Sequence, residues 1–147
     1  MAASTLTIHQ VFHLRAPVAK VFRALTDPSE ITKWFLAKAQ LTPRRGGRYD
    51  FTWQGGYRHE AAVLEFVQNR RLTLEWPGVG RGITRVTFSV RRAGMGTRLE
   101  VRHTGYRRTP AWLEMYGGTQ SGWAYYLMNL KSVLEHGHDL RSAGDTA

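Results

Sequence analysis

The chain has 147 residues, a length that suits one globular domain, and its 42% hydrophobic and 22% charged residues allow a packed core. Its lack of cysteine excludes disulfides, thiolate metal sites and thiol nucleophiles, and is compatible with a reducing cytoplasm. The formal net charge of +10 raises the question of an anionic partner, but many of the arginines occur as adjacent pairs near expected loops and strand ends. We interpret this charge mainly as solubilising and leave a loop-clustered anion-binding surface as the alternative.

The N-terminal residues carry no basic stretch followed by an apolar run, so we expect no secretory signal. No apolar run approaches the roughly 18 residues that a bilayer-spanning helix needs. The sequence therefore predicts a cytoplasmic protein with no membrane span.

The first elements in chain order are an expected strand and two short helices. Residues 5–14 alternate well enough to predict the strand, and Pro17 fits the first turn of a helix with apolar residues at helical spacing. Asp27-Pro28-Ser29-Glu30 is a second helix-start signal, in which Asp27 can act as the N-cap. This second helix is expected to end at Trp34-Phe35.

From about residue 37 the apolar pattern has a period of two, which predicts about six strands separated by glycine-containing turns. Thr109-Pro110 then begins a long helix, expected to run to about Glu135. Three glycines in its first half are compatible with a kink: Gly117, Gly118 and Gly122. Residues 137–147 are expected to form a flexible tail.

These elements predict an α+β fold in a single domain over residues 1–147, with an ordered core at about residues 5–136. A twisted antiparallel sheet with one apolar face must cover that face, and only the C-terminal helix is long enough to do so. One helix cannot cover a wide, curved sheet completely. We therefore expect a cavity between the sheet and this helix.

Several blocks of residues, in a fixed order, resemble a known family. They are Ala16-Pro17 with Val21-Phe22; Asp27-Pro28-Ser29-Glu30 before Trp34-Phe35; Gly46-Gly47-Arg48-Tyr49 with Phe51; Val63-Leu64-Glu65 before Arg71-Leu72 and Trp76; Gly96-Thr97-Arg98-Leu99 with His103-Thr104-Gly105-Tyr106; and Gly122-Trp123 before Leu127 and Leu130. With these blocks the chain resembles the bacterial relatives of the activator of heat-shock-protein-90 ATPase, in the START/Bet v 1-like (SRPBCC) superfamily. The resemblance covers nearly all of residues 5–136 and implies the helix-grip fold, a curved antiparallel sheet wrapped around a long C-terminal helix.

The resemblance implies less about activity, because function depends on the site and not on the fold. Relatives with this architecture bind lipids, hormones or polyketides, and some cyclise or dehydrate such ligands. The eukaryotic activators bind a chaperone, but they carry an additional N-terminal domain for which this chain has no room.

Aromatic residues are the candidates for the wall of the expected cavity, because Trp and Tyr combine a large apolar body with a polar tip. The candidate ligand-binding residues are Trp34, Phe35, Tyr49, Trp53, Trp76, His103, Tyr106, Trp112, Trp123, Tyr126 and Leu127. Burying one ring contributes on the order of 2–3 kcal/mol, so three or four rings around a flat ligand could support micromolar binding. Each ring taken alone fits an ordinary core equally well.

His103 is the most informative ionisable residue, since the alternation of its strand turns it inward. It is interpreted either as a buried histidine bonded to a neighbour or as a polar anchor or general acid/base. Glu60 and Glu65 lie on the same expected strand. Which face of the sheet each side chain points to depends on whether a bulge near Ala61-Ala62 reverses the alternation. The catalytic residues therefore stay unassigned, with His103 and Glu60 as weak candidates.

Other motifs lack what their chemistry needs. The pairs His9/His13 and His136/His138 have no further ligands for a metal, and the glycine clusters lack the ending of a phosphate-binding loop. We expect no metal and no cofactor.

The leading hypothesis is a domain that binds a hydrophobic small molecule, lipid-like or aromatic, in the internal cavity. Two alternatives stay open: an enzyme of the cyclase or dehydratase type that uses a cavity histidine or glutamate, and a module that contacts a chaperone or regulator. The absence of a recognition helix and of a basic stripe argues against nucleic acid. The sequence does not distinguish a monomer from a homodimer.

Overall fold

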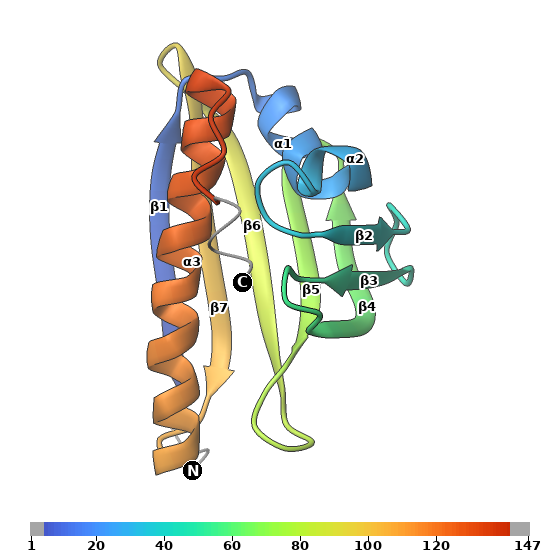
Figure 1. Ribbon diagram of the computed structural model, residues 1–147, viewed down its shortest axis with the longest axis vertical. Helices are drawn as coiled ribbons and strands as arrows, with labels where there is room; N and C mark the ends of the chain where they lie inside the picture. Colours follow the sequence, from blue (N-terminus) through green and yellow to red (C-terminus); the bar gives the residue numbers. More distant parts are fainter. Residues whose placement is uncertain (1–4, 142–147) are drawn as a thin grey trace.

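The computed structural model describes residues 5–141 (Figure 1), in which seven antiparallel strands form one sheet in the order β1-β7-β6-β5-β4-β3-β2. The elements are β1 (Leu6–Leu14), α1 (Val18–Thr26), α2 (Pro28–Ile31), β2 (Lys38–Leu41), β3 (Arg48–Thr52), β4 (Arg58–Val67), β5 (Arg71–Pro77), β6 (Ile83–Ala93), β7 (Gly96–Tyr106) and α3 (Pro110–His136). The predicted α+β helix-grip fold is confirmed, with two short helices after the first strand and six strands before the last helix.

The boundary between α1 and α2 follows the expected capping chemistry. Asp27 ends α1 and accepts hydrogen bonds from the backbone N–H of Ser29 at 2.9 Å and from its hydroxyl at 2.8 Å. α2 ends at Ile31, earlier than expected, and residues 32–35 continue as turns. The Trp34 indole N–H donates to the Ala24 carbonyl at 2.8 Å, which holds this turn against α1 instead of extending the helix.

The sheet is strongly curved: Figure 1 shows β2 and β3 running across the direction of β6 and β7. An irregularity in the β4–β5 register lies between Val63 and Glu65. It follows the Ala61-Ala62 position, where the sequence allowed a bulge. Helix α3 packs mainly on β1 and β7, and α1 packs on β6 and β7. The inner face of β3 and β5 is therefore covered largely by side chains rather than by a helix.

Helix α3 is continuous from Pro110 to His136 through its three glycines, so these residues produce no break. Gly137 ends it in the left-handed conformation, at φ 66°, which glycine adopts without strain. The backbone N–H of Leu140 then donates to the Asn129 side chain at 2.6 Å. Residues 142–147, the rest of the expected tail, lie outside the described residues. None of the helices in residues 5–141 is long and apolar enough to cross a bilayer.

The loop between β5 and β6 packs against the indole of Trp112 at the start of α3. A Cβ added at Gly82 would lie 2.5 Å from the Trp112 ring, and one added at Gly78 would also collide with it. The loop is closed by a hydrogen bond from the Gly78 N–H to the Gly82 carbonyl at 2.8 Å. The Trp112 ring is thus buried against the backbone of Gly78 and Gly82, away from the centre of the sheet.

We expect Gly82→Ala to lower the free energy of unfolding by about 1–3 kcal/mol, because the new methyl group overlaps the Trp112 ring. Urea denaturation measures the loss, and Gly117→Ala in α3, where an added Cβ meets nothing within 4 Å, is the matched control. When Trp112 is replaced by leucine, Gly82→Ala should lower the free energy of unfolding much less, because the ring that the methyl group overlaps is gone. An equal cost in both backgrounds would show that the ring is not its source.

Candidate functional site

A hydrogen bond between two buried side chains joins α3 to the sheet. The indole N–H of Trp123, which is 3% exposed, donates to Nδ1 of His103 on β7 at 3.0 Å. Two rigid rings are thereby fixed at the interface of helix and sheet. Because neither ring can rotate without breaking this bond, Trp123 presents a fixed face to the space beside it.

The partners of His103 determine where its proton lies. Since Nδ1 accepts from Trp123, the neutral ring carries its proton on Nε2, which donates to the Thr84 hydroxyl oxygen at 2.7 Å. The Thr84 hydroxyl in turn can donate to the Trp76 carbonyl at 3.2 Å, and the Tyr106 hydroxyl lies 3.3 Å from Nε2. Burial lowers the pKa of His103 to about 3, so the ring is neutral at pH 7.

An aromatic cleft of about 90 Å³ lies beside Trp123, open on one side and lined almost wholly by carbon. Five rings form its walls: Phe35 from the α2–β2 turn, Trp53 just after β3, Trp76 on β5, and Trp123 and Tyr126 on α3. Thr119 and Gly122 of α3 complete the lining. Elements distant in sequence therefore converge on one apolar opening between the helix and the sheet.

The rings of the cleft hold one another mainly in edge-to-face and tilted contacts. The Phe35 ring lies 5.4 Å from that of Trp53 and 5.0 Å from that of Tyr126, and the Trp76 ring lies 5.5 Å from that of Trp123. Such pairs add stabilisation beyond their buried area and restrict ring rotation. The cleft is thus largely preformed.

A second histidine, His59 on β4, lies directly behind two of these rings, 5.1 Å from Trp53 and 4.6 Å from Trp76 between ring centroids. The Tyr49 hydroxyl gives its only proton to the Glu75 carbonyl, so it must accept from His59 Nε2, at 2.9 Å. Burial lowers the pKa of His59 to about 4 and raises the pKa of Tyr49. Nδ1 of His59 is buried and has no partner among residues 5–141.

His59, Thr119 and Gly122 were not among the site residues predicted from the sequence. A signal for His59 was present, because it alternates with Ala61 and Val63 on β4 and pairs with Phe51 of β3. Thr119 and Gly122 carried no signal as lining residues, since only the position of α3 over the sheet exposes them to the cleft.

The structure places five of the eleven candidate ligand-binding residues in the lining of the cleft and the other six outside it. Trp34 stacks behind Phe35 with ring centroids 4.8 Å apart, and Trp112 lies on the glycine loop. Tyr49, Tyr106, His103 and Leu127 are buried and do not line the cleft.

Neither weak catalytic candidate presents a reactive group to the cleft. Both ring nitrogens of His103 are engaged, and the exposed Glu60 lies 3.5 Å from the Arg58 guanidinium on the hairpin. Within residues 5–141, no three histidine or acidic side chains converge as metal ligands would. A catalytic role for His103 or Glu60 stays a prediction without a supporting contact.

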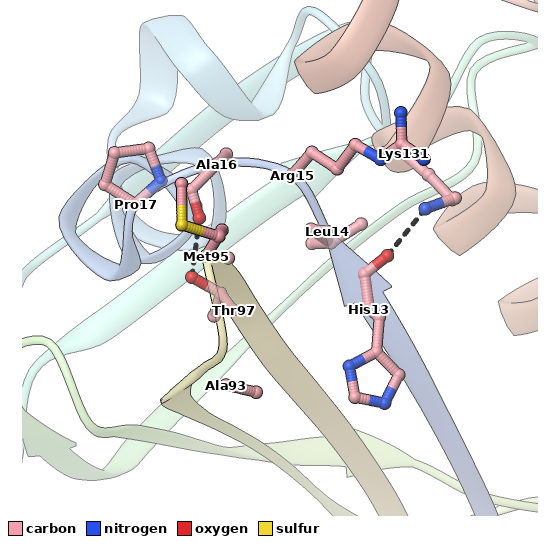
Figure 2. A pocket seen from close by; sticks show the side chains of 10 residues that line it. His13, Leu14, Arg15, Ala16, Pro17, Ala93, Met95, Thr97 and Lys131 are labelled. Atoms are coloured by element: carbon pink, nitrogen blue, oxygen red, sulfur yellow. Dashed lines mark hydrogen bonds between the residues drawn. The ribbon is translucent and has the colours of Figure 1, made fainter.

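A larger hollow of about 550 Å³ lies where β1 ends, beside the β6–β7 hairpin (Figure 2). Several of its polar groups bond to one another: the Lys131 ammonium donates to the His13 carbonyl at 2.6 Å, and the Thr97 hydroxyl donates to the Ala16 carbonyl at 2.7 Å. The hollow shares no lining residue with the aromatic cleft. We interpret it as a surface groove of the fold.

Comparison with known proteins agrees with this architecture. Residues 15–135 match the family described as Activator of Hsp90 ATPase homolog 1-like protein, and no curated protein matches the sequence. A protein from Mesorhizobium loti is 26% identical, with a TM-score of 0.78 over 92% of this chain and 99% of its own. CalU16 from Micromonospora echinospora is 28% identical, with a TM-score of 0.67 over 90% of this chain and 77% of its own. The Aha1 dimer from Colwellia psychrerythraea is 21% identical, with a TM-score of 0.78 over 90% of this chain and 98% of its own. At this identity the similarity supports the fold alone.

The burial of His103 predicts a specific loss of stability in acid. The unfolded chain takes up a proton near pH 6.5, whereas the folded ring takes it up only near pH 3, so falling pH favours the unfolded state throughout this window. We expect this histidine alone to remove about 2 kcal/mol of stability between pH 7 and pH 5. His103→Gln should therefore lose about 2 kcal/mol less than the unmodified protein in urea denaturation at the two pH values. Equal losses in both proteins would contradict the lowered pKa of the buried His103.

Proposed function

This chain belongs to the family of Activator of Hsp90 ATPase homolog 1-like proteins, and we propose that it binds a flat, apolar, ring-containing small molecule in the aromatic cleft. The observation that carries the proposal is the convergence of five aromatic rings on one carbon-lined opening between α3 and the sheet. Small-molecule sites in proteins are typically apolar and concave, and they favour the interfaces between secondary-structure layers.

The fixed orientation of the rings favours binding of a flat molecule. Trp123 is held by its bond to His103, and the Trp76 ring packs between His59 and Trp123, so a ligand stacking on them would not need to order either side chain. Avoiding that entropy cost is the main way in which a preformed site gains affinity. A flexible lipid chain would lose more of its own conformational freedom in the same place.

The size of the cleft limits how much of a ligand it encloses. An engineered apolar cavity of about 150 Å³ is known to hold one benzene molecule, so the 90 Å³ cleft accommodates the inserted edge of a ring and leaves the remainder at its open side. This geometry supports an aromatic ligand over a fully enclosed lipid. Catalysis and chaperone binding stay predictions, and no contact among residues 5–141 favours either one.

A side chain added at Gly122 tests the site directly. A Cβ there meets nothing within 4 Å although the residue lines the cleft, so the side chain of Gly122→Leu would occupy space that the ligand needs. With 2-naphthol as ligand, isothermal titration calorimetry of the unmodified protein should give a Kd of roughly 10–100 µM. Gly122→Leu should raise that Kd by about tenfold or more.

Gly117→Leu is the matched control, because a Cβ at Gly117 also meets nothing within 4 Å but the residue does not line the cleft. Both substitutions replace glycine within a helix and should raise stability by about 0.5–1 kcal/mol, which excludes unfolding as the cause of lost binding. Equal binding by the two variants, or no heat of binding with the unmodified protein, would overturn the proposal.

A further inference from the structure

The segment after α3 turns back along the helix (Figure 1) and bonds to the turn that carries Phe35, one of the cleft residues. Asn129 of α3 is fully buried and anchors this return. Its amide oxygen accepts from the Leu140 N–H at 2.6 Å, and its amide nitrogen donates to the Asp139 carboxylate at 2.9 Å. The same amide nitrogen donates to the Trp34 carbonyl at 2.8 Å. Asn129 thus connects the C-terminal segment with the α2–β2 turn.

Arg141 makes the second connection to that turn. Its side chain is 5% exposed and donates to the Thr32 carbonyl at 2.9 Å and to the Leu36 carbonyl at 3.3 Å. Its guanidinium is held in place by a two-point contact with the Asp139 carboxylate, at 3.1 and 3.0 Å. We call this arrangement of Asn129, Asp139 and Arg141 the C-terminal clasp.

The clasp holds the irregular turn that carries one of the cleft rings, Phe35. Trp76 belongs to β5, Trp53 follows β3 directly, and two rings belong to α3, whereas Phe35 lies between α2 and β2. The carbonyls of residues 32, 34 and 36 all accept hydrogen bonds from the clasp. Since Phe35 contacts rings on both sides of the cleft, its position sets the width of the opening.

We propose that Arg141 is a specificity-determining residue, which limits the cleft to ligands of about one inserted ring by fixing Phe35 through the C-terminal clasp. The inference rests on the proposed function and adds a size limit to it. Without the guanidinium, the Thr32 and Leu36 carbonyls lose their donors, and the turn can move outward with its phenyl ring. A lysine cannot replace Arg141, because one ammonium on a flexible stem does not reproduce the planar fork that spans both carbonyls and Asp139.

The test compares Arg141→Ala and Arg141→Lys with the unmodified protein and with Arg71→Ala. The last variant removes an arginine–glutamate pair at 3.2 Å that shares no residue with the cleft or the clasp. The first readout is the hydrogen exchange of the Phe35 and Leu36 amides, which donate to the Ile31 carbonyl at 3.0 and 3.4 Å. Both position-141 variants should exchange there about tenfold faster or more, and Arg71→Ala should not.

The second readout is the ratio of two dissociation constants, that of 1-anilinonaphthalene-8-sulfonate to that of the smaller 2-naphthol. Arg141→Ala should lower this ratio by about fivefold or more, since the larger dye gains most from a wider cleft. Unchanged amide exchange, or an unchanged ratio in variants that bind both ligands, overturns the role of Arg141 alone. If neither ligand binds any of the proteins, the proposed function fails and the size limit fails with it, whatever the amide exchange shows.

Discussion

The hydrogen bond from the Trp123 indole to the buried His103 is the contact that determines the character of the site. It ties α3 to β7 and fixes the ring that forms the centre of the cleft wall. It also requires a neutral imidazole with its proton on Nε2, and burial secures that state by lowering the pKa of His103. A histidine with both nitrogens engaged in this way links the helix to the sheet, so the cleft gains a rigid wall.

The rest of the cleft follows from the curvature of the sheet. One helix over β1 and β7 leaves the inner face of β3 and β5 to be covered by side chains, and large rings cover it with a small gap between them. The walls differ in how they are held: Trp76 and Trp123 belong to regular elements, whereas Phe35 lies on a turn fixed by side chains from α3 and the segment after it. We infer a binding site with rigid walls on one side and an adjustable one on the other.

Much of this architecture could be predicted from local sequence signals. The capping role of Asp27, the period-two strands and the helical spacing of apolar residues after Pro110 depend on neighbours within a few residues. Alternation along the strands also puts Trp53 on the same face as Phe51, and Trp76 on the same face as Leu74, and the structure buries both of these faces. The position of Trp112 could not be predicted, because it depends on glycines some thirty residues earlier in the chain. The clasp could not be predicted either, because Arg141 bonds to residues more than a hundred positions away in the chain. The volume of the cleft depends on how the rings pack, which local sequence patterns do not determine.

The five tryptophans provide the most direct test of the account, because three line the cleft and Trp34 and Trp112 do not. Their indole N–H groups can be followed by ¹H–¹⁵N NMR while 2-naphthol is added. We predict that the resonances of Trp53, Trp76 and Trp123 shift with one common dissociation constant, while those of Trp34 and Trp112 stay in place. Shifts confined to Trp34 or Trp112, or no shift at all, would contradict a binding site in the aromatic cleft.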